Sequence, residues 1–185
     1  DPRWVNLAEK SIEEILIDHA FCEQKAATSC ISLIVTYSYL KPIVERITPV
    51  VREEWDHFSL VLKELDKRGF SLGKPRKDEY VKELLLFQKK GVITEIVLVD
   101  KLLTNALIEA RSCERFKLLS EGLQDPYFKN FYHRFMISEA GHYRLFMDLA
   151  KIYQSENYVK KRWHEFLEFE KKLMKKIKIR GDRMH

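Results

Sequence analysis

REEWDHF at residues 52–58 and SEAGHY at residues 138–143 decide the fold, because each stretch contains a Glu-x-x-His motif. On an α-helix, residues three positions apart project from the same face, so each motif presents one carboxylate and one imidazole to the same point. Either motif alone is weak support for a metal site, since a pair of this kind can arise by chance. The motif residues are Glu54, His57, Glu139 and His142.

Two further glutamates turn the motifs into a repeat. Glu23 precedes Glu54 by 31 positions, and Glu109 precedes Glu139 by 30 positions. The chain therefore contains one unit twice: a helix with an inward glutamate, a turn, and an antiparallel helix with Glu-x-x-His. One Glu from each of two helices and Glu-x-x-His from each of the other two form the ligand set of di-iron and di-manganese carboxylate bundles. We therefore predict an all-α protein, a ferritin-like four-helix bundle with additional short and C-terminal helices.

Apolar residues at three- and four-residue spacing predict where the helices lie, and no segment alternates convincingly with the period of a strand. Pro49 predicts a kink in the second bundle helix or the start of a separate helix. A length of 185 residues fits one domain over residues 1–185. The bundle helices are expected at about 7–38, 41–68, 93–120 and 126–153, with a short helix at 79–89 and a C-terminal helix from 155 or 157.

Four glutamates lie on the inward faces of the predicted helices, with no obvious inward cations to match them. Burying four carboxylates without cations is prohibitive, so we expect two divalent ions to neutralise them. Oxygen and imidazole ligands suit iron, manganese or zinc, and the residues do not choose among these metals. The predicted ligands are Glu23, Glu54, His57, Glu109, Glu139 and His142.

Three polar residues near the predicted ligands leave alternatives open. His19 and Asn105 lie one turn before Glu23 and Glu109 respectively. They are either groups that orient the ligands or filler polar residues near a polar site. Glu114 is a rival to Glu109 as the ligand of its helix, but Glu114 breaks the repeated spacing.

Composition describes an ordinary globular protein, with 45% hydrophobic and 33% charged residues. The formal net charge of +5 permits an anionic partner without demanding one. No apolar run reaches the length of a membrane span, no signal-peptide pattern is visible, and the three cysteines form no paired motif. We therefore expect a cytoplasmic protein with no membrane partner.

Five segments of the sequence resemble a known enzyme family. The most specific segments are IDHAFCEQKAA at 17–27 and LIEARSCERF at 107–116, and PRWV at 2–5 adds to the two Glu-x-x-His stretches. On these segments, the chain resembles the bacterial tRNA hydroxylases that hydroxylate the isopentenyl group of 2-methylthio-isopentenyladenosine beside the anticodon. The resemblance covers nearly the whole chain.

The resemblance implies an O2-dependent non-haem di-iron monooxygenase that acts through two iron ions held by the six predicted ligands. O2 is then the co-substrate, and tRNA is the partner. No flavin or nicotinamide fingerprint is visible in the sequence, so we expect an external reductase to supply electrons. The alternatives are a ferritin-like iron-oxidising or storage protein and a manganese catalase-type enzyme. The oligomeric state stays open.

Basic residues around the metal pocket are expected to hold the phosphates of the anticodon loop. The loop at residues 69–77 and the arginines near Glu109 supply the candidates. The lysines at residues 171–178 are weaker candidates, because lysine-rich helix ends are usually solvated faces. The candidate tRNA contacts are Lys74, Arg76, Lys77, Arg111 and Arg115.

Overall fold

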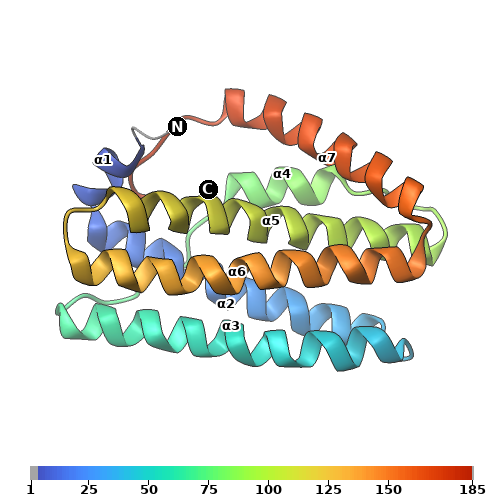
Figure 1. The fold of residues 1–185 in the computed structure, drawn as a ribbon, viewed down its shortest axis with the longest axis horizontal. Helices are drawn as coiled ribbons and strands as arrows, with labels where there is room; N and C mark the ends of the chain where they lie inside the picture. Colours follow the sequence, from blue (N-terminus) through green and yellow to red (C-terminus); the bar gives the residue numbers. More distant parts are fainter. Residues whose placement is uncertain (1–3, 185) are drawn as a thin grey trace. The chain divides into compact units, whose positions relative to one another are not determined.

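The computed structural model describes residues 4–184, and these residues form seven α-helices and no strand (Figure 1). The prediction of an all-α protein is therefore confirmed. Within this part of the chain, none of the helices combines the length and apolar character that a membrane span requires. The helices are α1 (Trp4–Glu9), α2 (Ile12–Thr36), α3 (Lys41–Lys67), α4 (Glu79–Phe87), α5 (Thr94–Gly122), α6 (Pro126–Tyr153) and α7 (Glu156–Lys176).

The described residues fall into two compact units. The first unit comprises residues 4–77, 115–135 and 180–184, and the second comprises residues 78–114 and 136–179. Helices α5 and α6 each contribute residues to both units, because the unit boundaries lie inside these helices. The single domain stays a prediction, because two compact units can still unfold together as one domain.

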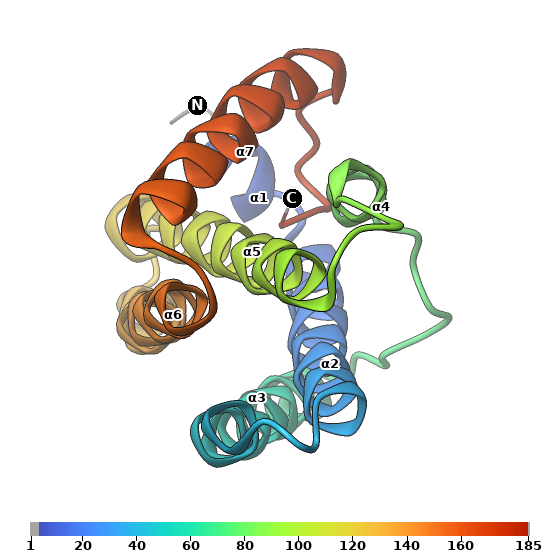
Figure 2. The ribbon, with the colours of Figure 1, turned by 90° about the vertical axis from the view of Figure 1, so that its right-hand side faces the viewer.

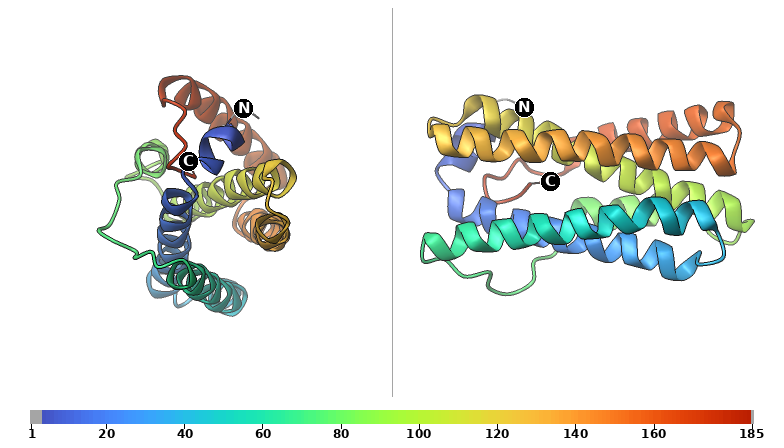
Figure 3. Two further views of the ribbon diagram at one scale, coloured as in Figure 1. Left: turned by 90° about the vertical axis from the view of Figure 1, so that its left-hand side faces the viewer. Right: turned by 60° about the horizontal axis from the view of Figure 1, so that its bottom comes forward.

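In the first unit, α2 and α3 form an antiparallel hairpin, and they lie side by side in Figures 1, 2 and 3. Pro42 lies in the first turn of α3, where its missing N–H costs no helical hydrogen bond. Helix α3 runs unbroken through Pro49, so the alternative of a separate helix beginning there is wrong. The helix continues because proline removes only one backbone hydrogen bond, while Ile47 and Val50 beside it are buried.

The predicted helix at residues 7–38 is wrong at its start, because the structure has two helices there. Helices α1 and α2 are separated at Ser11, whose backbone is non-helical with φ −136° and ψ 42°. The break lets α1 bury Trp4, whose indole Nε1 donates a hydrogen bond of 2.8 Å to the carbonyl of Arg180. Local periodicity could not reveal this break, since the two bonded residues are 176 positions apart.

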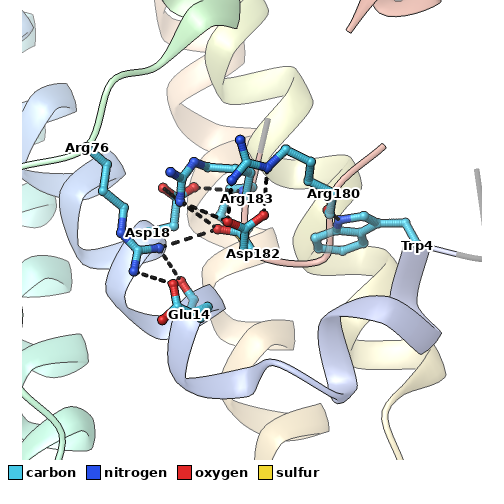
Figure 4. Close-up of polar contacts among 8 residues, drawn as sticks. Trp4, Glu14, Asp18, Arg76, Arg180, Asp182 and Arg183 are labelled. Atoms are coloured by element: carbon cyan, nitrogen blue, oxygen red, sulfur yellow. Dashed lines mark hydrogen bonds and ion pairs between the residues drawn. The ribbon is translucent and has the colours of Figure 1, made fainter. Parts of the chain in front are cut away.

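The chain end after α7 returns to the first unit, beside α1 and the start of α2 (Figure 4). Asp18 of α2 binds this segment through both carboxylate oxygens. One oxygen accepts a hydrogen bond of 2.8 Å from the Met184 N–H, and the other lies 3.5 Å from Arg183 Nη1. Gly181 permits the close approach, because a Cβ there would lie 2.6 Å from the carbonyl oxygen of Leu7.

The second unit contains α4, α7 and the parts of α5 and α6 outside the first unit; Figure 2 shows these helices. Two ion pairs with buried carboxylates join α5 and α7. Asp100 of α5 is fully buried and accepts hydrogen bonds of 2.9 and 2.7 Å from Arg162 of α7. Glu170 of α7 accepts a hydrogen bond of 2.7 Å from Arg111 of α5. These arginines neutralise the carboxylates that the second unit buries between α5 and α7.

Three of the predicted helix starts agree with the capping residues in the structure. Asp78 accepts a hydrogen bond of 3.0 Å from the backbone of α4, and Ser155 accepts one of 3.3 Å from the backbone of α7. The side chain of Asp125 accepts a hydrogen bond of 2.8 Å from the Tyr127 N–H at the start of α6. Side-chain caps are readable from sequence because they satisfy backbone donors within the same turn.

Candidate metal centre

The first unit brings together a cluster of two carboxylates and one imidazole. Helix α2 supplies Glu23, and one face of α3 supplies Glu54 and His57, as the Glu-x-x-His spacing predicts. One ligand atom from each residue lies within 4.8 Å of the others. His57 Nδ1 is 3.4 Å from Glu23 Oε2 and 3.9 Å from Glu54 Oε2. Both carboxylates are buried, so the protein has removed them from bulk water.

His19 lies one turn before Glu23 and contacts it, with 2.7 Å between His19 Nε2 and Glu23 Oε1. An ionised carboxylate can only accept a hydrogen bond, so Nε2 is the nitrogen that must carry the proton. The Nδ1 atom has no hydrogen-bond partner among residues 4–184, which leaves Glu23 as the polar contact of this buried ring. The aromatic rings around His19 belong to Phe116, Phe131, Tyr132 and Phe135.

The charge of Glu23 is fixed by its two histidine neighbours. Burial raises the pKa of the Glu23 carboxyl, but hydrogen bonds from His19 and His57 lower this pKa by more. The net pKa lies well below the usual range for a glutamate, because hydrogen bonding to the charged form favours that form. Glu23 is therefore ionised at neutral pH and carries the full negative charge that a cation site needs.

The second unit holds a cluster of the same composition. Helix α5 supplies Glu109, and one face of α6 supplies Glu139 and His142. One ligand atom from each residue lies within 4.8 Å of the others, and His142 Nδ1 is 3.6 Å from Glu139 Oε2. All three side chains are buried. The two halves of the sequence repeat thus form two clusters, each with two carboxylates and one imidazole.

The neighbours of Glu109 separate the alternatives that the sequence left open. Glu114 is exposed and forms an ion pair with Arg111, whereas Glu109 is buried beside Glu139 and His142. The structure therefore favours Glu109 over Glu114 as the ligand of α5. Asn105 is buried one turn before Glu109, and its Nδ2 donates a hydrogen bond of 2.9 Å to the carbonyl of Lys101.

The donor atoms of each cluster fit a divalent metal ion. Two carboxylates match the charge of one divalent cation, and an imidazole adds a nitrogen donor of the kind that iron, manganese and zinc accept. Two buried carboxylates within 4.8 Å of each other repel, and a cation between them converts this repulsion into attraction. The composition, burial and spacing of both clusters are therefore compatible with the binding of a metal ion.

A pocket of about 290 Å³ opens beside His57 in the first unit. It lies between α3 and the start of α6, and sequence reasoning missed the basic residues at its edge. Of these basic residues, Lys67 carried a signal, because positions 57, 60, 64 and 67 recur at three- and four-residue spacing along one side of the predicted helix. The lining residues are His57, Leu60, Lys63, Glu64, Lys67, Tyr127, Phe131, Arg134 and Phe135.

The arginines predicted to contact tRNA have partners inside the protein. Arg76 donates to the carboxylate of Glu14 and, at 3.4 Å, to the carbonyl of Asp182 (Figure 4). The guanidinium of Arg115 is buried, 4.2 Å from the ring centroid of Trp4.

Arg111 is the third of these arginines, and it binds Glu170 and Glu114. The remaining two candidates, Lys74 and Lys77, are exposed in the loop after α3. A contact between tRNA and any of the three arginines would have to replace an existing contact, whereas a contact to either lysine would not.

Helices that carry two such carboxylate–histidine clusters define the class of ferritin-like carboxylate bundles. The solved structure of a Synechococcus protein with aldehyde deformylating oxygenase activity matches this chain with a TM-score of 0.92 and 33% sequence identity. The match covers 98% of this chain and 90% of that chain. The prediction of a ferritin-like fold is therefore confirmed.

Within that class, the chain belongs to the tRNA-(MS2IO6A)-hydroxylase (MiaE) family, whose model matches residues 1–185. A tRNA 2-(methylsulfanyl)-N(6)-isopentenyladenosine(37) hydroxylase from Pseudomonas putida is 37% identical over 153 residues, covering 83% of this chain and 73% of that protein. The protein of the same name from Salmonella typhimurium is 28% identical over 205 residues, covering 83% of this chain and 74% of that protein. The family resemblance inferred from the sequence is therefore confirmed.

Proposed function

We propose that this protein is a cytoplasmic tRNA hydroxylase. It inserts one oxygen atom from O2 into the isopentenyl group of 2-methylthio-isopentenyladenosine, beside the anticodon. The observation that carries the proposal is the family match over residues 1–185. Two curated relatives bear the name of this activity, which favours it over iron storage and over a manganese catalase-type reaction.

The two carboxylate–histidine clusters are proposed to hold one pair of iron ions. The first unit contributes Glu23, Glu54 and His57, and the second contributes Glu109, Glu139 and His142. Four carboxylates balance the charge of two divalent ions, and the two imidazoles complete a donor set suited to iron. When bound, the iron pair supplies the activation of O2 that oxidation of an unreactive C–H bond requires.

The residues around the first cluster orient the Glu23 carboxylate and shield it from water. The hydrogen bond from His19 fixes the orientation of the Glu23 carboxylate and favours its ionised form. The rings of Phe116 and Phe135, each 4.6 Å from the His19 ring, exclude water from this side of the cluster. Exclusion of water strengthens every electrostatic interaction within the cluster.

The reaction needs partners besides the metal. Hydroxylation consumes one O2, two electrons and two protons, and it yields the alcohol and one water. A separate reductase is proposed to deliver the electrons, because the sequence shows no flavin or nicotinamide fingerprint. The other partner is the tRNA itself, whose anticodon loop presents unpaired bases that a protein pocket can accept.

The test is a hydroxylation assay with the iron-loaded protein. The protein is incubated with a reductant, O2 and tRNA that carries the isopentenyl group without its hydroxyl, and the digested nucleosides are separated by mass. We expect the modified nucleoside to gain the mass of one oxygen, and to gain none when O2 is left out. No gain of mass with fully iron-loaded, reduced protein would contradict the proposal.

A further inference from the structure

The pocket beside His57 has the dimensions of a binding site for one modified base. Its volume of about 290 Å³ falls near the lower end of the range for small-molecule sites, roughly 300–1,000 Å³. Its interior is apolar, and its edge carries three basic side chains. A pocket of this kind suits an apolar group attached to a charged backbone.

We propose that this pocket receives the prenylated adenine of the anticodon loop, with the prenyl chain directed toward His57 and the neighbouring phosphates on the basic edge. The inference rests on the proposed function and adds the residues that recognise the substrate. Three parts of the pocket take three roles: an apolar interior, an aromatic platform and a phosphate clamp.

The apolar interior leads to a predicted metal ligand. The ring of Phe135 lies 4.9 Å from the ring of His57 and 5.0 Å from the ring of Phe131, and Leu60 completes this lining. A prenyl chain has no polar atom to satisfy, so its burial here gains hydrophobic free energy in proportion to the area covered. The bound chain therefore presents its methyl groups to the side of the pocket where His57 lies.

Tyr127 is the aromatic platform. Its side chain is 47% exposed, and its ring stacks on Phe131 with centroids 6.2 Å apart and an interplanar angle of 21°. The hydroxyl donates a hydrogen bond of 2.6 Å to Glu64, which also accepts one of 2.7 Å from Arg68. The ring is thus held in place before substrate arrives, and a base turned out of the loop can stack on it.

Lys63, Lys67 and Arg134 form the phosphate clamp at the edge of the pocket. All three are exposed, the lysines on α3 and the arginine on α6. Among the described residues, neither Lys63 nor Arg134 forms an ion pair, and Lys67 lies 3.8 Å from Glu64. Lys63 and Arg134 can therefore bind phosphates without the loss of an ion pair, in contrast to Arg76, and Lys67 would give up only its 3.8 Å contact with Glu64.

The first experiment removes the clamp. The triple variant Lys63→Ala, Lys67→Ala, Arg134→Ala is compared with Lys82→Ala, Lys90→Ala, Lys161→Ala, which removes the same charge at exposed positions that are not candidate tRNA contacts. We expect the clamp variant to bind the prenylated tRNA roughly tenfold or more weakly, and its log–log salt slope to become shallower by about two. Equal loss in both triple variants would overturn the clamp, because it would reflect net charge alone.

The second experiment fills the interior. Leu60→Trp places a large ring in the pocket at a position that is 38% exposed, so the fold tolerates it. We expect at least roughly a tenfold loss of hydroxylation with iron content close to wild type, and a smaller loss of tRNA affinity than in the clamp variant, because the prenyl chain loses its place while the clamp remains. The control is Leu86→Trp, because Leu86 is an exposed residue of α4 that does not line the pocket. Wild-type turnover in Leu60→Trp would overturn the assignment of the interior.

The outcomes separate the inference from the proposed function. A wild-type protein that is iron-loaded and reduced but does not hydroxylate tRNA defeats the proposed function, and the pocket assignment falls with it. A wild-type protein that hydroxylates tRNA, with pocket variants that match their controls, defeats only the pocket assignment.

Discussion

Buried carboxylates occur in two settings in this molecule. In the second unit, Asp100 and Glu170 are bonded to arginines, Arg162 and Arg111 respectively. In the candidate metal centre, the carboxylate of Glu23 contacts histidines instead: it lies 2.7 Å from His19 Nε2 and 3.4 Å from His57 Nδ1. An arginine is always charged, whereas a neutral imidazole brings no net charge.

The difference indicates a separate role for each group of acids. An acid bonded to arginine is neutralised by the fold itself, so it supports the protein without any ligand. Glu23 contacts histidines instead, and an imidazole is a group that also binds metal ions, so this acid lies in a setting suited to a cation. We therefore expect substitutions at the arginine-paired acids and at the clustered glutamates to act differently.

The largest effect is expected from loss of a predicted ligand. His57→Ala or His142→Ala should reduce metal content from two ions per chain to one or fewer, and hydroxylation should fall by more than about a hundredfold. Metal analysis of protein purified from iron-replete cells checks the content. His133→Ala, an exposed histidine on α6, is the control. Two tightly bound ions in both ligand variants would show that the assignment is wrong.

A stability measurement on the metal-free protein tests the contrast itself. Asp100→Asn removes the buried countercharge of Arg162 and leaves this arginine with its ion pair to the more exposed Glu165, so we expect the free energy of unfolding to fall by about 3 kcal/mol. Glu54→Gln removes one of several clustered carboxylates, so we expect it to leave the metal-free protein equally or more stable.

Urea unfolding measures the stability of both variants. Asp148→Asn serves as the control, because its ion pair with Lys151 is on the surface and contributes less than about 1 kcal/mol. If Glu54→Gln destabilised the metal-free protein as much as Asp100→Asn, the two groups of acids would not differ in kind.

Local patterns made one part of the structure predictable. Glu-x-x-His and the 31- and 30-residue spacings depend only on helical geometry, so the sequence predicts both clusters and their helices. Asp125 could be read as a helix start for the same reason, because its cap lies within one turn.

Contacts between distant residues made the rest unpredictable. Arg111 meets Glu170 across 59 positions, and Arg76 meets Asp182 across 106, so the sequence presented both arginines as available for tRNA. The break at Ser11 was hidden likewise, because the partner of Trp4 lies near the other end of the chain.

The hydrogen bond between His19 and Glu23 allows a narrower test of how the clustered acids are held. His19→Leu removes the donor to Glu23, and we expect the affinity for iron to fall by about 10–100-fold. His19→Gln keeps a side-chain N–H near the same place and should recover most of that affinity. Competition with a chelator measures the affinity of each variant. Equal losses in Leu and Gln variants would mean that the ring acts through packing rather than by positioning Glu23.

The smallest effect is expected at the basic loop. Arg76→Ala removes contacts to Glu14 and Asp182, so thermal or urea unfolding should show a loss of about 1–2 kcal/mol, with little change in the salt slope of tRNA binding. Lys74→Ala should change stability by less than about 0.5 kcal/mol, because Lys74 is exposed. A large drop in tRNA affinity for Arg76→Ala, without loss of stability, would place this arginine at the nucleic acid instead.

The central proposal is that the protein holds one pair of iron ions through the six proposed ligands Glu23, Glu54, His57, Glu109, Glu139 and His142. Mössbauer spectroscopy of the protein loaded with isotope-enriched iron tests it most directly, because the spectrum reports both the number of ions and their magnetic coupling. We predict two iron ions per chain whose spins are coupled. One ion per chain, or two ions that behave as independent paramagnets, would contradict the claim.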